Sequence, residues 1–159
     1  MCLICDRIRM IKKGSNPYFV KELKTGYVVL GDHQHFKGYT LFLCKEHCTE
    51  LFHLDARIRQ EYLKEMALVA EAVSVAFGAE KMNYELLGNG DTHLHWHLFP
   101  RIEGDLDGYG NEGRGPVWWY PRENMYAEQA RPTDAELADM KEKLLCRLNR
   151  LQEDSRWLM

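Results

Sequence analysis

The stretch that decides the fold is Thr92-His93-Leu94-His95-Trp96-His97-Leu98-Phe99-Pro100-Arg101. Side chains on a β-strand point alternately to opposite faces. A strand here therefore places its three histidines on one face and Leu94, Trp96 and Leu98 on the other, where they suit a core. Three imidazoles in a row are difficult to explain by packing, because every buried ring nitrogen needs a hydrogen-bond partner. The alternation predicts a strand whose histidine face carries the chemistry.

Two chemical interpretations of this histidine row are open. Alternating histidines on a strand can bind a metal such as zinc. Alternatively, one imidazole acts as a nucleophile, because a neutral imidazole, with an ordinary pKa of about 6.5, is available at neutral pH without a dedicated base. The plain alternative to both is a set of solvated histidines on an open sheet face.

Apolar runs separated by turn residues predict further short strands. Residues 88–91, Gly-Asn-Gly-Asp, form a turn between the histidine strand and a strand over 82–87. Lys24-Thr25-Gly26 suits a hairpin turn between two others. The histidine strand is predicted over 94–99, and the remaining predicted strands cover residues 18–23, 27–30 and 39–44. Strands joined by short turns, without alternating β-α units, indicate an antiparallel sheet.

Two amphipathic helices are also predicted. The first begins after Asp55, a suitable N-cap, and ends at Gly78, a suitable left-handed cap. Its apolar residues recur at steps of three and four: Ile58, Tyr62, Met66, Val69, Val73 and Phe77. A capping box from Thr133 to Glu136 opens the second helix. The expected fold is α+β: an antiparallel sheet of about five strands with one long helix and a C-terminal helix.

A glycine-rich segment interrupts this pattern and divides the single expected domain, residues 1–159, into three parts. The core with the histidine strand covers 1–101, the segment covers 102–131, and the C-terminal helix follows at 132–159. Such a long irregular stretch is usually functional or a flap. Its run Val117-Trp118-Trp119-Tyr120-Pro121-Arg122 either anchors a loop on the sheet or lets a Trp or Arg contact a substrate.

Composition restricts the class of partner. The 159 residues are 45% hydrophobic and 28% charged, with a formal net charge of −3, which is ordinary for a globular protein. Without a basic tract the chain is a poor match for nucleic acid or an anionic membrane. No apolar run is long enough for a transmembrane helix, and the apolar start is too short for a signal peptide. We therefore expect a cytoplasmic protein with a small-molecule substrate and neither nucleic acid nor membrane as partner.

The pattern His-Leu-His-Trp-His-Leu-Phe at 93–99 resembles the signature of the histidine triad (HIT) family, in which three histidines alternate with apolar residues. Other sequence motifs occur in the same order as in the family. They are Cys2-x-x-Cys5, the stretch Lys-Gly-Tyr-Thr-Leu at 37–41, which opens a strand, and Cys-Lys-Glu-His at 44–47, which follows that strand. Together they cover roughly residues 1–101. The sequence is most similar to bacterial members that are like diadenosine polyphosphate hydrolases. The resemblance implies a HIT-like fold and a homodimer.

The resemblance also implies a mechanism. The middle histidine of the family attacks the α-phosphorus of a nucleotide, and this role falls on His95. The third histidine, here His97, contacts the phosphoryl oxygens. Water or another acceptor then takes the nucleotidyl group. The implied substrate is a dinucleoside polyphosphate, a nucleoside polyphosphate or a nucleotide phosphoramidate. The alternative is a nucleotide-binding module with little turnover.

Three further binding residues are implied by position. Asn89 stands four residues before His93, where many members have a Gln that holds the phosphate. Asn83 matches an asparagine near the phosphates, and Asp32 lies where members place an acidic or amide residue on the ribose. Tyr39 stands where the family usually has His, a change that the sequence does not explain.

A structural zinc is the implied cofactor. Some HIT proteins, and the related galactose-1-phosphate uridylyltransferases, hold zinc with a Cys-x-x-Cys pair, a histidine past the strand and the first triad histidine. The matching positions are Cys2, Cys5, His47 and His93, a complete tetrahedral set of the closed, structural type. Two alternatives remain: Cys44 or Cys48 replaces one of these ligands, or Cys2 and Cys5 are ordinary apolar residues of a reduced protein.

Overall fold

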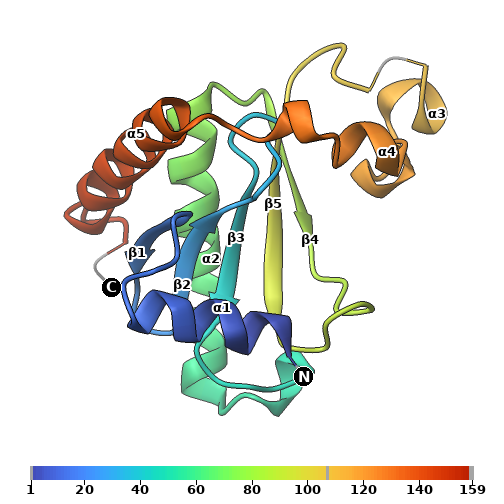
Figure 1. The fold of residues 1–159 in the computed structure, drawn as a ribbon. Helices are drawn as coiled ribbons and strands as arrows, with labels where there is room; N and C mark the ends of the chain where they lie inside the picture. The colour runs from blue at the N-terminus through green and yellow to red at the C-terminus, as the bar shows by residue number, and fades with distance from the viewer. Residues whose placement is uncertain (1, 107, 158–159) are drawn as a thin grey trace.

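The computed structural model describes residues 2–106 and 108–157. At its centre lies a five-stranded sheet in the order β1-β2-β3-β5-β4, with every neighbouring pair antiparallel (Figure 1). The strands are β1 (Phe19–Glu22), β2 (Gly26–Leu30), β3 (Thr40–Cys44), β4 (Lys81–Glu85) and β5 (His95–Arg101). Each lies within two residues of its predicted ends, and the predicted α+β class is confirmed.

Two long helices cover one face of the sheet (Figure 1). They are α2 (Ala56–Phe77) and α5 (Asp134–Gln152). Val28, Phe42 and Leu98 of the central strands are fully buried in the same core as the apolar sides of both helices. The predicted caps are present: Gly78 adopts φ 68° at the end of α2, and the capping box opens α5. No helix in the described residues is long and apolar enough to cross a membrane.

A third helix, α1 (Leu3–Lys12), lies on the opposite face of the sheet (Figure 1). It was not predicted, although the spacing of Ile4, Ile8 and Ile11 carries a weak helical signal. Ile4 and Ile8 are buried against Tyr27, Val29 and Leu43 of the sheet. A ten-residue helix is marginal alone in water, so tertiary packing supplies most of its stability.

The triad strand divides its side chains as the alternation predicts. Leu98 packs in the core below α2 and α5, and Trp96 packs against that core. On the other face, His95 and His97 stand opposite Leu43 and Leu41 of β3, on the side that carries α1. The strand itself begins at His95 rather than Leu94, so the first triad histidine lies just before it.

In its described residues, the segment over 102–131 contains only short helical turns: α3 (Gly110–Gly113), η2 (Val117–Trp119), α4 (Arg122–Met125) and η3 (Glu128–Ala130). It extends beyond the ends of β5 and β4 and leads back to α5 (Figure 1). Its Trp118, Tyr120 and Tyr126 pack around Phe36 and Phe99. The segment is therefore anchored by aromatic residues, which is the first of its two interpretations.

Candidate active site and metal cluster

Four side chains from three separate parts of the chain meet at the start of α1. The ligand atoms of Cys2, Cys5, His47 and His93 all lie within 4.8 Å of one another. Nδ1 of His93 is 3.6 Å from the Cys2 sulfur, 3.4 Å from the Cys5 sulfur and 3.2 Å from Nδ1 of His47. Tetrahedral zinc, with bonds of about 2.3 Å to sulfur and 2.0–2.1 Å to nitrogen, separates its ligands by about 3.3–3.8 Å. The donor set and spacing fit this ion.

Neighbouring groups contact two of these donors. His93 is fully buried, and its Nε2 donates a hydrogen bond of 2.8 Å to the Cys44 carbonyl oxygen. This bond leaves the lone pair of Nδ1 for a metal. Asp91 accepts from the Cys2 thiol at 3.2 Å and from the Ile4 backbone amide at 3.1 Å. Burial alone would raise the pKa of Asp91, but these hydrogen bonds hold it below its usual value.

The two alternative cysteine ligands lie in a different environment. Cys44 is fully buried in the core on the α2 side of the sheet, and burial raises the pKa of its thiol to about 12. Cys48 packs against the same core. In the part of the chain that the structure describes, neither joins a cluster of three or more metal-ligating side chains.

His95 is held in one tautomer. The side chain is 6% exposed, and Nδ1 lies 2.5 Å from the backbone carbonyl oxygen of His93. A carbonyl only accepts, so Nδ1 carries the proton and Nε2 keeps a free lone pair. His95 lines the cleft described below, which gives the lone pair access to a ligand.

His97 is held in the opposite tautomer. The Tyr39 hydroxyl lies 2.6 Å from Nδ1 of His97 and has no other hydrogen bond in the described residues. The phenol therefore donates to Nδ1, and Nε2 of His97 carries the proton. Burial, with a smaller effect from the adjacent His95, lowers the pKa of His97 to about 3. His97 is a neutral hydrogen-bond donor at physiological pH, and Tyr39, whose role the sequence left unexplained, orients it.

The low pKa of His97 predicts a loss of stability in acid. The native pKa of about 3 lies below the ordinary value of 6.5, so between these pH values the unfolded chain binds a proton that the native protein does not. The contribution of His97 to the free energy of unfolding is fully present well above pH 6.5. Between pH 7 and pH 5 this contribution falls by about 2 kcal/mol. Urea unfolding at both pH values should show a smaller drop in His97→Gln than in the wild type. Equal drops would contradict the assignment.

Two adjoining cavities share His95 and His97 in their walls. The first has a volume of about 290 Å³ and extends over β2 and β3, where Arg7, Asp32, Tyr39 and Leu41 line it. The second has a volume of about 550 Å³ and extends toward the β4 side, over the turn at 87–91. We call them the β3-side cleft and the β4-side cleft. Because β5 lies between β3 and β4, the two histidines stand at the boundary.

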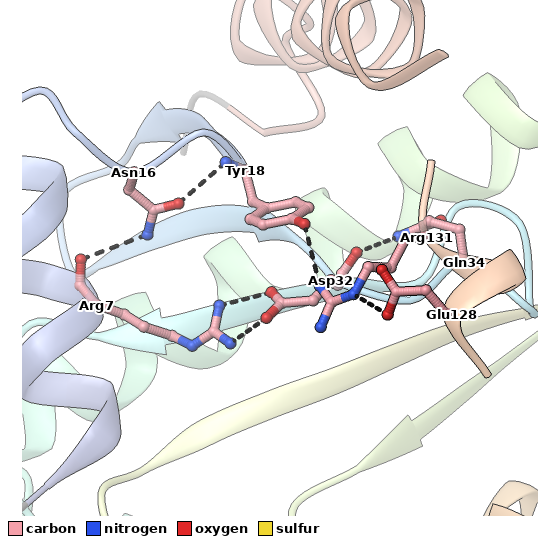
Figure 2. A network of polar contacts seen from close by, with 8 residues as sticks. Arg7, Asn16, Tyr18, Asp32, Gln34, Glu128 and Arg131 are labelled. Atoms are coloured by element: carbon pink, nitrogen blue, oxygen red, sulfur yellow. Dashed lines mark hydrogen bonds and ion pairs between the residues drawn. The ribbon is translucent and has the colours of Figure 1, made fainter. Parts of the chain in front are cut away.

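Asp32 is held in the β3-side cleft by a residue that the sequence analysis missed. Arg7 on α1 donates to both carboxylate oxygens, at 2.7 and 2.6 Å (Figure 2). These hydrogen bonds raise the pKa of the Arg7 guanidinium. On the far side of Asp32, Figure 2 shows a second pair, Arg131 with Glu128. Helix α1 therefore supplies a wall of the cleft, and together with its N-cap Cys2 it supplies two members of the metal cluster.

The two predicted asparagines take different positions. Asn89 lines the β4-side cleft together with His95 and His97. Asn83 shares the sheet face of the triad, but its side-chain oxygen accepts from Arg101 at 2.9 Å and the residue lines neither cleft. The β4 residue in register with His97 is Glu85, whose pKa is raised by burial.

The segment over 102–131 contributes three side chains to the β4-side cleft: Trp118, Arg122 and Tyr126. The Trp118 ring stands edge-on to His97, with centroids 5.4 Å apart. Trp118 and Arg122 belong to the run that the sequence analysis singled out for substrate contact, whereas nothing in the sequence pointed to Tyr126. The aromatic residues of the segment therefore anchor it, and its edge borders the β4-side cleft, while contact with a substrate stays a prediction.

The triad does not form a metal centre of its own in the described residues. The ring of His93 directs Nδ1 toward the cysteines, while Nδ1 of His95 and Nδ1 of His97 each have a hydrogen-bond partner elsewhere. The one cluster of three or more metal-ligating side chains found among residues 2–106 and 108–157 contains His93 but neither of the other two.

The family model and the solved structures that this chain resembles all point to the histidine triad family. The HIT domain matches residues 16–104. Among solved structures, the chain is similar to a histidine triad protein from Bradyrhizobium japonicum, with 19% identity, a TM-score of 0.69, and coverage of 82% of this chain and 89% of that one. The chain is also similar to a hypothetical histidine triad nucleotide-binding protein from Sulfolobus tokodaii, with 20% identity and a TM-score of 0.69. The match covers 93% of this chain and 94% of that one. A third similar structure is a zinc-bound histidine triad family protein from Mycobacterium smegmatis, with 19% identity and a TM-score of 0.64. The match covers 96% of each chain. No curated protein matches.

Proposed function

Because the chain belongs to the HIT domain family, we propose that it is a nucleotidyl hydrolase or transferase that works through a nucleotidyl group on His95. The substrate is a dinucleoside polyphosphate, a nucleoside polyphosphate or a nucleotide phosphoramidate. The observation that carries the proposal is the hydrogen bond from Nδ1 of His95 to the His93 carbonyl, because it leaves the Nε2 lone pair free at the boundary of both clefts.

The proposed reaction has two steps. Nε2 of His95 attacks the α-phosphorus, the bond from phosphorus to the leaving group breaks, and its electron pair stays on the leaving atom. Water then attacks the same phosphorus, the nitrogen–phosphorus bond breaks, and the nucleoside monophosphate leaves with release of a proton. In both steps the Nε2–H of His97 donates to a phosphoryl oxygen. Phosphoryl transfer depends mainly on such positioning and charge stabilisation.

The β3-side cleft is the proposed nucleoside site, with Asp32 on the ribose. Both carboxylate oxygens of Asp32 already accept from Arg7. A carboxylate oxygen has two lone pairs, so each can accept a further hydrogen bond from a ribose hydroxyl. The bidentate contact with Arg7 fixes the orientation of the carboxylate for this contact. In the β4-side cleft, Asn89 is proposed to contact the phosphate.

A structural zinc is proposed at Cys2, Cys5, His47 and His93, where the geometry fits it. There it would supply a cross-link between α1, the end of β3 and the triad strand. Since His95 bonds to the backbone of His93, holding His93 in place also orients the proposed nucleophile. The homodimer, the single-domain organisation and the cytoplasmic location stay predictions.

The test is a rapid-quench assay with radiolabelled diadenosine tetraphosphate and adenosine phosphoramidate. We expect acid-labile label on the wild-type protein and free AMP as product. Absence of label and of turnover, with nucleotide still bound, would contradict the proposal and favour the binding module. Label that persists in His95→Ala would contradict the assignment of the nucleophile.

A further inference from the structure

The two clefts differ in the charge that they offer to a ligand. In the β3-side cleft, the guanidinium of Arg7 is neutralised by the bidentate ion pair with Asp32. In the β4-side cleft, the cation is Arg122, whose guanidinium carbon lies 5.8 Å from the centroid of the Tyr126 ring. Among the described residues, this guanidinium has no hydrogen bond or ion pair with a carboxylate. Its charge is therefore available to an anion.

The other polar groups of the β4-side cleft do not pair with this guanidinium. Asp91 is the acidic side chain in its wall, and it is bonded to the Cys2 thiol and the Ile4 amide. His97 is neutral, since burial lowers its pKa to about 3. Arg122 is therefore a cation without a carboxylate partner among the described residues, in the same cleft as the proposed nucleophile, although the Asp91 carboxylate brings the formal charge of the wall to zero.

The walls of the same cleft suit a large leaving group. Its volume of about 550 Å³ exceeds the 290 Å³ of the β3-side cleft. Trp118 offers an aromatic surface, and Leu3 and Leu87 are 57% and 45% exposed at its border. A phosphate chain needs the cation, and a base or another planar group beyond it can stack on the aromatic side chains.

We propose that the β4-side cleft binds the leaving group and that Arg122 makes the site selective for leaving groups that carry phosphate. This inference rests on the proposed function. It narrows the substrate class to phosphoric anhydrides, namely nucleoside and dinucleoside polyphosphates, over phosphoramidates with an uncharged amine. Arg122 lies outside the residues 16–104 that match the HIT domain, so the selectivity belongs to this chain's own segment over 102–131.

The charge balance of the first step explains the selectivity. When Nε2 of His95 bonds to the α-phosphorus of an anhydride, the bridging P–O bond breaks and its electron pair stays on the oxygen. That oxygen becomes part of an anionic phosphate, which Arg122 stabilises by donating N–H hydrogen bonds without losing a proton. In a phosphoramidate the P–N bond breaks instead, and its electron pair stays on the nitrogen, which takes up a proton from the solvent and leaves as a neutral amine, so no new anion faces Arg122.

The experiment compares the two substrate classes in Arg122→Gln. For diadenosine tetraphosphate, we expect kcat/KM to fall at least about tenfold, the range for losing a charge-assisted hydrogen bond. For adenosine phosphoramidate, we expect a change of less than about twofold on the same basis. Arg122→Lys should restore part of the loss, because it returns the charge without the guanidinium geometry. The matched control is Arg114→Gln, an exposed arginine of the same segment that lines neither cleft.

A binding measurement makes the test independent of turnover. In the His95→Ala background, adding Arg122→Gln should weaken the binding of diadenosine tetraphosphate at least about tenfold and leave AMP binding within about twofold. Equal effects on both substrates and both ligands, or no effect, would overturn the inference and leave the proposed function standing. Wild-type protein without label or turnover would overturn the proposed function, and the binding ratio would then decide the role of Arg122 alone.

Discussion

Replacing His95 with Ala is expected to lower kcat about 10⁴-fold or more, because the substitution removes the atom that forms the covalent intermediate. Nucleotide affinity should change far less, since the clefts keep their other walls, among them Asp32 and Asn89. Steady-state kinetics and equilibrium binding of the same nucleotide, measured on the same preparation, separate the two quantities.

His53→Ala is the matched control for this substitution. His53 lies in the short turn before α2, is exposed, and lines neither cleft. The kcat of the His53→Ala protein should stay within about twofold of the wild-type value, as for other surface substitutions. Thermal unfolding of both variants shows whether either has lost the native fold. A native-like His95→Ala protein that retains a tenth of the wild-type kcat would contradict the role of His95.

Replacing Cys5 with Ser is expected to abolish stoichiometric metal binding and to lower stability. The cluster joins α1 to His47 and His93, which lie 42 and 88 residues away along the chain, so a bound metal closes two long loops. Metal coordination contributes directly to folding free energy when the unfolded chain lacks the site. A loss of about 3 kcal/mol corresponds to roughly 6–12 °C in Tm for a chain of this size.

Metal content and hydrogen exchange check this prediction without reference to activity. The wild type should contain one zinc per chain, and Cys5→Ser should contain none, with faster amide exchange in α1 than elsewhere. Cys146→Ser is the control, because Cys146 is an exposed thiol outside the cluster. Cys48→Ser tests the alternative ligand and should keep its zinc. Full zinc content in Cys5→Ser would contradict the assigned ligand set.

Local physics made much of the fold readable from the sequence. The alternation of His95, Trp96, His97 and Leu98 predicts a strand with one apolar face, since period two places neighbours on opposite sides. Asp55 and Gly78 mark the ends of α2, because caps act through their own backbone neighbourhood. The Cys-x-x-Cys pair could be joined to distant histidines only through the resemblance to HIT proteins, and the structure does bring these four residues together.

Contacts between distant residues were not readable in this way. Helix α1 is short, and the carboxylate that accepts from its Ile4 amide belongs to Asp91, 87 residues away. Arg7 meets Asp32 only because α1 packs on the sheet face that also carries the triad. Asn83 was expected at the phosphates, but the register of β4 on β5 leaves its side chain on Arg101.

Three features could be predicted from the sequence alone: which histidines share a strand face, where the long helices begin and end, and which residue types are available to bind metal and phosphate. Only the tertiary structure decided the tautomers of His95 and His97, because each depends on a hydrogen bond formed across the fold or by the local backbone path. It also decided that Arg122 borders the β4-side cleft without a carboxylate partner among the residues that the structure describes. The physical reason is that periodicity and capping act over a few residues, whereas hydrogen bonds and charge pairing depend on groups that folding alone brings together.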